Sequence, residues 1–81
     1  MRPAHSRYVP LIIAATDAFL LEDCAASRRY AEQALQIRPG DTLASELLFD
    51  SLRADYMAYT SLAMLKDRYR AARDSLEPAP R

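Results

Sequence analysis

The side chains that could carry chemistry are few in this chain. His5 is the only histidine and Cys24 the only cysteine among 81 residues. A structural zinc site takes a full set of cysteine and histidine ligands, and a nucleophilic cysteine needs a base beside it. The only glycine, Gly40, cannot by itself form a phosphate-binding loop. The residues therefore predict a protein that is not an enzyme and has no cofactor, in which Cys24 packs as a small apolar side chain.

Three carboxylates, Asp17, Glu22 and Asp23, gather where the first helical segment is expected to end. Such a trio can bind a metal ion, but carboxylates in this place more often face solvent or cap the next helix. Asp23 directly precedes a second helical segment, and we expect it to cap that helix. The trio therefore predicts a solvated helix end, with no metal ion.

A nucleic-acid site would need basic residues in excess over acidic ones. The last helical segment carries four cations, namely Lys66, Arg68, Arg70 and Arg73. Two aspartates are interleaved with them, and the whole chain has eleven basic and eleven acidic residues. Cations near the end of a helix also stabilise its dipole without any ligand. The charge balance gives no reason to expect nucleic acid or an anionic membrane surface as a partner.

The apolar run from Tyr8 to Ala15 follows Arg2 and Arg7 and has the outline of a short signal peptide. It is interrupted by Asp17 and is far shorter than the roughly 20 apolar residues that span a membrane. We therefore interpret it as a first buried helix. A single cysteine excludes an internal disulfide and is typical of a cytoplasmic protein. The preference for arginine over lysine, with abundant alanine, is typical of a GC-rich bacterial genome.

The elements that would position a site are predicted to be helical throughout. Good helix formers dominate, and no stretch alternates as a strand does. The chain is long enough for one domain, and 51% of its residues are hydrophobic, which is a rich supply for its size. The sequence therefore predicts an all-α domain over residues 9–76. We expect a disordered arm over residues 1–8 and a non-helical tail over 77–81.

Three to four helices are expected within this domain, arranged as helical hairpins. Their approximate ranges are 9–21, 24–37, 42–54 and 57–76. Pro10 suits the first turn of the first helix. The inward stripe of the second helix is expected to consist of Ser27, Tyr30 or Ala31, Ala34 and Ile37. Between the second and third helices, we expect Gly40 in a left-handed conformation, with Asp41 or Thr42 as the cap.

The segment 42–76 contains neither glycine nor proline, so two interpretations stay open. It can form one long helix of about 50 Å, at about 1.5 Å per residue. It can also break near Arg53–Tyr56 into two helices. Ordinary helix lengths favour the break.

The stretch from Glu22 to Asp41 resembles the second half of a tetratricopeptide repeat. The matching residues are small Ser27 and Ala31, the pair Ala34 and Leu35, and Pro39. Small residues let two helices approach closely, and the proline ends the second helix so that the next repeat can turn back. One hairpin, residues 9–41, is fairly clear, whereas the following copy is degenerate and lacks a second Ala-Leu-to-Pro ending. The size and helical layout are also similar to those of small type III secretion chaperones of this class.

This resemblance implies a non-catalytic module for protein–protein interaction, an adaptor or small chaperone that holds an amphipathic helix or peptide of a partner. The residues implied to line its groove are Ile12, Thr16, Phe19 and Leu20, with Asp50 and Arg53 beyond them. An equally open interpretation makes Ile12 and Phe19 simple core residues.

Two other functions remain open. In the first, a stripe from Leu48 to Leu76 pairs with itself, and the protein is a self-associating helical bundle or coiled coil. In the second, which the charge balance disfavours, the last helix binds nucleic acid. No small-molecule substrate and no membrane partner are expected.

Overall fold

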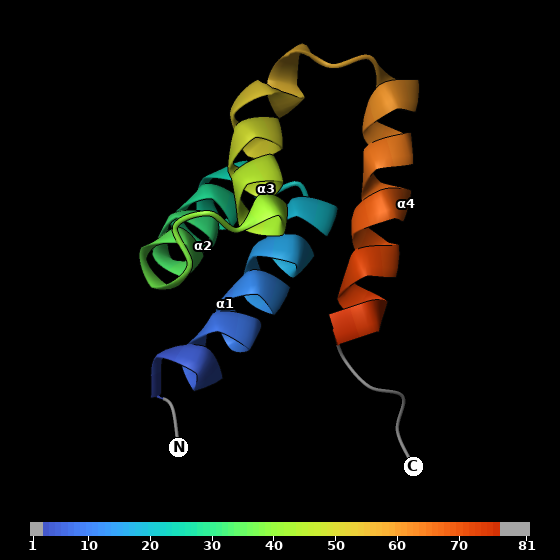
Figure 1. Cartoon of the computed structure of the whole chain (residues 1–81). Coiled ribbons are helices and arrows are strands. Elements are labelled where there is room, and N and C mark those ends of the chain that lie inside the picture. Colours follow the sequence, from blue (N-terminus) through green and yellow to red (C-terminus); the bar gives the residue numbers. More distant parts are fainter. Residues whose placement is uncertain (1–2, 77–81) are drawn as a thin grey trace.

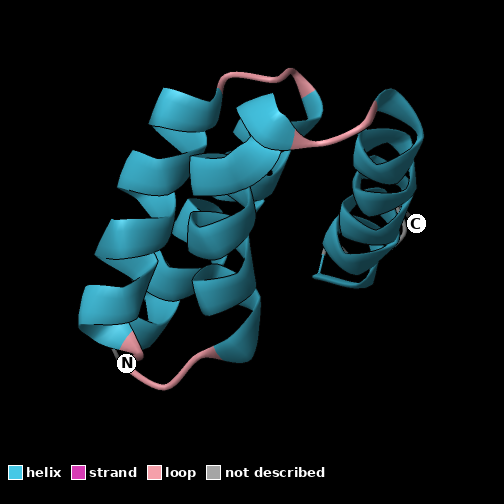
Figure 2. Cartoon of the chain, turned by 90° about the horizontal axis from the view of Figure 1, so that it is seen from above, coloured by secondary structure: helices cyan, strands magenta, loops and turns pink. Residues whose placement is uncertain are grey.

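In the computed structural model, the described residues form four α-helices and one short 3-10 turn. The structure describes residues 3–76, with side chains described from Arg7 onward. The elements are α1 (Pro3–Leu20), α2 (Cys24–Ile37), α3 (Thr42–Arg53), the 3-10 turn η1 (Ala54–Tyr56) and α4 (Tyr59–Leu76). Because the described residues contain no strand, the predicted all-α class is confirmed. Helices α1, α2 and α3 pack side by side, and α4 lies to one side of them (Figures 1 and 2).

Small side chains hold α1 and α2 together. Ala15, Ala31 and Ala34 are fully buried at this contact. The Ser27 hydroxyl, also buried, donates a hydrogen bond to the Ala15 carbonyl oxygen at 2.8 Å. A side chain of α2 can reach the backbone of α1 only where the two helices are close. The predicted inward stripe of the second helix is confirmed.

The predicted helix caps are confirmed, but the predicted role of Gly40 is wrong. Asp23 accepts the Ala26 N–H at 3.2 Å, and Asp41 accepts the Ala44 N–H at 2.9 Å. Gly40 does not have a positive φ angle. Instead, α2 ends at Ile37 and is capped by Arg38, whose N–H donates to the Ala34 carbonyl oxygen at 2.9 Å.

The left-handed residue lies in the other turn, at Glu22, with a φ of 63°. The Glu22 N–H donates to the Phe19 carbonyl oxygen at 2.9 Å, and the Asp23 N–H donates to that of Ala18 at 2.8 Å. This is the Schellman arrangement of helix ends, in which glycine usually takes the left-handed position. A glutamate there is strained. The turn after α1 therefore has a carboxylate at a position where the backbone is strained.

Helix α1 begins at Pro3, so the predictions of a disordered arm over residues 1–8 and of a helix start at 9 are wrong for the described part of that arm. Pro10 lies inside the helix instead of in its first turn. The physical reason is Tyr8, which is buried against the turn between α2 and α3. The Arg38 guanidinium lies 4.0 Å from its ring centroid, and its hydroxyl is hydrogen-bonded to Asp41. Residues 1–2 and the predicted tail at 77–81 lie outside the described residues.

The break near Arg53–Tyr56 is confirmed. Helix α3 ends at Arg53, the 3-10 turn follows, and Met57 is extended, with φ −87° and ψ 147°. This extended residue lets α4 fold back alongside α1 and α3 instead of continuing α3 (Figure 1). The single long helix is therefore not the conformation of this structure.

Candidate functional site

The candidate site is the surface of α1 and α3 that α4 covers. Phe19 lies at its centre and is buried against Tyr69 of α4. The two rings meet edge to face, with centroids 5.0 Å apart and planes inclined by 68°. Four carboxylates surround this contact, and we call them, together with Phe19, the acidic face: Asp17, Glu22, Glu46 and Asp50.

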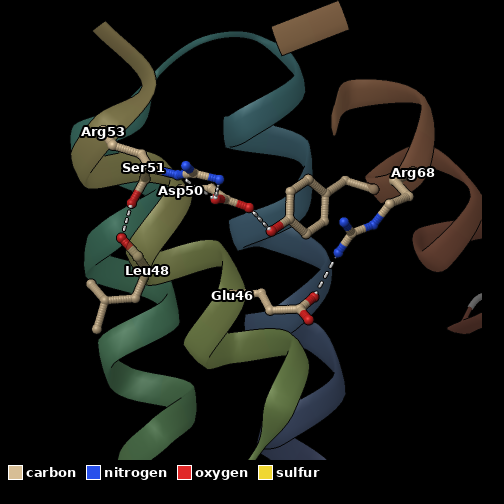
Figure 3. Close-up of polar contacts among 7 residues, drawn as sticks. Glu46, Leu48, Asp50, Ser51, Arg53 and Arg68 are labelled. Carbon is tan, nitrogen blue, oxygen red and sulfur yellow. Dashed lines mark hydrogen bonds and ion pairs between the residues drawn. The ribbon is translucent and has the colours of Figure 1, made fainter. Parts of the chain in front are cut away.

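Tyr69 is the residue that fixes α4 on the acidic face. It is the one buried residue of α4, and its hydroxyl donates a hydrogen bond to Asp50 at 2.5 Å. Asp50 is also buried, and it accepts a second hydrogen bond from Arg53 Nε at 3.0 Å (Figure 3). Burial, together with the hydrogen bond to Asp50, raises the pKa of Tyr69. The hydroxyl therefore stays protonated at neutral pH, as a donor to a carboxylate must.

Three ion pairs surround this buried contact. Arg73 Nη1 lies 2.6 Å from an Asp17 oxygen, and Lys66 is paired with Glu22. Arg68 reaches Glu46 of α3 at 2.9 Å (Figure 3). These pairs are partly exposed to solvent, so each contributes little to stability. Their stronger effect is on register, because they place three cations of one helix opposite three carboxylates.

The remaining apolar packing of α4 is incomplete. Leu62, Leu65 and Leu76 are only half-buried against the core, and Met64 is exposed. A cavity of about 110 Å³ remains between the first half of α4 and the rest of the molecule. It is lined by Phe19, Glu22, Cys24, Ala54, Asp55 and Leu62. Helix α4 is therefore held by one buried aromatic contact, three half-buried leucines and polar pairs, whereas α1 and α2 are closely packed.

A buried polar atom shows the same incomplete fit. Arg73 Nε is buried and has no hydrogen-bond partner among the described residues. A buried donor without a partner is destabilising. That cost offsets part of what the Asp17 pair contributes, so the end of α4 is weakly attached.

The residues predicted to line a groove lie in two different places. Ile12 and Thr16 are fully buried in the core, and the Thr16 hydroxyl donates to the Ile12 carbonyl oxygen at 2.7 Å. Neither of them is open to a partner in this structure. Phe19 and Asp50 lie on the acidic face and contact Tyr69. Arg53 lies at its edge, beside Asp50.

Leu20, the remaining predicted residue, is half-buried against the core. The structure therefore brings together only part of the predicted set, around Tyr69. The alternative interpretation as core residues holds for Ile12 and, while α4 is in place, for Phe19.

Sequence reasoning missed the central role of Tyr69 and the carboxylate partners of the cations. The usable signal was the spacing of Lys66, Tyr69 and Arg73, which lie three and four residues apart and so share one face of a helix. The sequence alone also allows these cations to be phosphate ligands. Arg70 pairs within its own helix, with Asp67 at 2.8 Å, and Arg73 has a second partner there, Asp74 at 3.5 Å.

The other chemical candidates have ordinary structural surroundings. Burial, followed by the charges of Asp55, Glu22 and Asp23, raises the pKa of the Cys24 thiol, so the thiol is not activated. No group of three or more potential metal ligands occurs among the described residues. Among the helices that the structure describes, none is both long and apolar enough to cross a membrane.

Comparisons with protein-family models, with curated proteins and with solved structures gave no match to this chain. The likeness to a tetratricopeptide repeat therefore stays a prediction from the sequence.

Proposed function

We propose that this chain is a protein–protein interaction module that binds an amphipathic helix of a partner on the acidic face, in place of its own α4. The observation that supports this most strongly is α4 itself. It is a helix that lies on α1 and α3 through one buried aromatic residue and three ion pairs. The surface therefore already fits a helix of defined chemistry. An adaptor or small cytoplasmic chaperone works in this way.

The residues under α4 define which partner helix would fit. Asp50 is buried and needs a hydrogen-bond donor, which Tyr69 supplies. The surrounding carboxylates need cations about one turn to either side of that donor, as at Lys66 and Arg73. We therefore expect a partner helix with a tyrosine, a basic residue three positions before it and another four positions after it.

Exchange of α4 for a partner helix is energetically reasonable because α4 is weakly attached. Its ion pairs are partly solvated, and Arg73 Nε is buried without a hydrogen bond. The tether to α3 nevertheless gives α4 an effective concentration on the order of millimolar. A partner must therefore form contacts beyond those that α4 itself makes.

The test uses a fluorescent peptide that carries residues 59–76 and the full chain as receptor. In the Tyr69→Ala chain, α4 no longer fills the face, so the peptide should bind at least about tenfold more tightly than to the unchanged chain. Fluorescence anisotropy measures the affinity, and circular dichroism confirms that the variant keeps its helices. An Asp50→Ala substitution in the same variant should abolish binding. Equal affinity for all three chains would refute the proposal.

A nucleic-acid function has less support. Three of the four cations in the last helix are paired with carboxylates of α1, of the turn that follows α1, and of α3. Phosphate contacts would have to break these pairs. An anisotropy titration with labelled DNA and RNA at low salt should show no binding.

A further inference from the structure

Six large apolar side chains are strongly exposed in the described part of the chain, and four of them share a pattern. Phe49 is 62% exposed, Leu52 54%, Tyr56 89% and Tyr59 84%. They are three, four and three residues apart, which is the spacing of one apolar stripe along a helix that pairs with another helix. We call these four residues the hinge seam. In this structure the stripe is not continuous, because α3 ends at Arg53 and α4 begins at Tyr59.

The segment between α3 and α4 can become helical with few changes. Ala54 already has helical dihedral angles, φ −58° and ψ −36°. The 3-10 turn Ala54–Tyr56 needs only a small rearrangement. Arg53, with φ −110° and ψ 3°, must return to helical angles, and Met57 must leave its extended conformation. The segment contains neither glycine nor proline, and alanine and methionine favour a helix. We call this segment, residues 54–58, the hinge. The break between α3 and α4 is therefore not imposed by the residue types of the hinge.

A straight hinge would carry α4 away from its own acidic face. The combined helix over residues 42–76 would be about 50 Å long, at about 1.5 Å per residue. The acidic face would then lose its contacts with α4. Phe19 and Asp50 would lose Tyr69, and Asp17 would lose Arg73. A second copy of the chain carries the same α4 and can restore each of these contacts. Straightening would also bring all four seam residues onto one face.

We infer that two copies of this chain exchange α4. In the resulting dimer each α3, hinge and α4 form one helix, each α4 lies on the acidic face of the other copy, and the two hinge seams pack together. This is domain swapping, in which the monomer and the dimer share most contacts. The seam contacts are new in the dimer, and they bury side chains that the monomer leaves in water. The helix on each acidic face thus comes from a second copy of the chain, and no other partner is needed.

Two hinge variants should shift the equilibrium in opposite directions. Ala58→Pro fits the monomer, because Met57 already has the extended conformation that precedes a proline. The same proline disfavours a continuous helix. Met57→Ala favours the straight hinge, because alanine is the stronger helix former. Size-exclusion chromatography with light scattering over a dilution series should show more dimer for Met57→Ala than for the unchanged chain. Ala58→Pro should stay monomeric.

Cross-linking distinguishes exchange of α4 from any other dimer. Two single-cysteine chains are made in a Cys24→Ser background, one with Asp17→Cys and the other with Arg73→Cys. They are mixed at high concentration and treated with a short bis-maleimide. Since residues 17 and 73 face each other across the contact, exchange predicts a covalent product of dimer mass that neither chain forms alone. Adding Ala58→Pro to both chains should remove this product.

Several outcomes would overturn the inference. One is a monomer at every concentration, and another is a dimer that Ala58→Pro leaves intact. A dimer that forms no mixed cross-link would also contradict it. In a Tyr56→Lys, Tyr59→Lys chain the dimer should be weakened while the stability of the monomer stays the same, because both side chains are exposed in the monomer. Binding of the 59–76 peptide to a chain with both Ala58→Pro and Tyr69→Ala tests the proposed function in a chain that cannot exchange α4. The proposed function and the exchange of α4 can therefore fail independently.

Discussion

The Tyr69 hydroxyl donates a hydrogen bond to the Asp50 carboxylate at 2.5 Å, although the two residues are 19 positions apart and both are buried. This contact connects α4 to α3. It also keeps a buried carboxylate satisfied, together with Arg53 on the same helix as Asp50. A carboxylate left in that position without donors would be costly. The contact therefore stabilises the position of α4 on the acidic face, and the proposed partner helix would have to supply a donor in its place.

The first prediction concerns the hydroxyl alone. Tyr69→Phe keeps the ring against Phe19 but removes the donor to Asp50, so the free energy of unfolding should fall by about 1–3 kcal/mol. Urea unfolding followed by circular dichroism measures this change. Tyr59→Phe is the matched control, because Tyr59 is exposed and its change should stay within about 0.5 kcal/mol. Equal losses for the two variants would show that the hydrogen bond does not stabilise α4.

The second prediction concerns alkaline pH. Burial and the hydrogen bond to Asp50 raise the pKa of Tyr69, and burial, with Asp41, raises the pKa of Tyr8 to about 12. Tyrosine in an unfolded chain has a pKa of about 10. The folded state therefore holds these protons more tightly. The resulting stability is fully present below about pH 10 and is lost as the pH rises through the folded-state values.

Urea unfolding at a series of pH values between about 8 and about 11.5 checks this, with the free energy of unfolding falling in the upper half of the range. The Tyr8→Phe, Tyr69→Phe chain should be less stable at neutral pH but should show a shallower decline. The explanation would fail if the double variant declined as steeply as the unchanged chain.

Much of the fold could be predicted because its signals are local. The bounds of α2, the caps Asp23 and Asp41, and the break after Arg53 all depend on residues within a few positions. The start of α1 was wrong because it depends on Tyr8, which packs against Arg38 in a distant turn. Local spacing contains no information about such a contact.

The candidate site could be predicted only in part, for the same reason. Phe19 and Asp50 were chosen from a likeness to a repeat, and both do lie on one surface. What covers that surface depends on pairs such as Asp17 with Arg73, which are 56 positions apart. An equal number of acidic and basic residues is compatible with such pairs but does not say which ones form.

The third prediction follows from Gly40, whose predicted left-handed conformation the structure does not have. A Cβ atom added there would meet no atom within 4 Å. Gly40→Ala therefore restricts only the unfolded chain and should raise the free energy of unfolding by about 0.4–1 kcal/mol. A thermal or urea unfolding curve measures the gain. A loss of stability would mean that this turn needs a conformation that alanine cannot adopt.

The fourth prediction separates backbone strain from charge at Glu22. The residue has a φ of 63° and its carboxylate pairs with Lys66. Glu22→Gly removes the left-handed strain, worth about 1–2 kcal/mol. It also removes a partly exposed ion pair worth about 0–1 kcal/mol. We therefore expect overall stability to stay equal or to rise, while the attachment of α4 weakens.

Hydrogen exchange resolves these two effects because it reports on each helix separately. In Glu22→Gly, the amides of α4 should exchange faster than in the unchanged chain, whereas those of α1 and α2 should exchange at the same rate or more slowly. Lys66→Ala, which removes the same ion pair without changing the turn, should accelerate only α4. If Glu22→Gly left α4 unaffected while Lys66→Ala accelerated it, the stabilising partner of Lys66 would not be Glu22. If both expected results are found, Glu22 destabilises the turn after α1 through its backbone strain but stabilises α4 on the acidic face through its pair with Lys66.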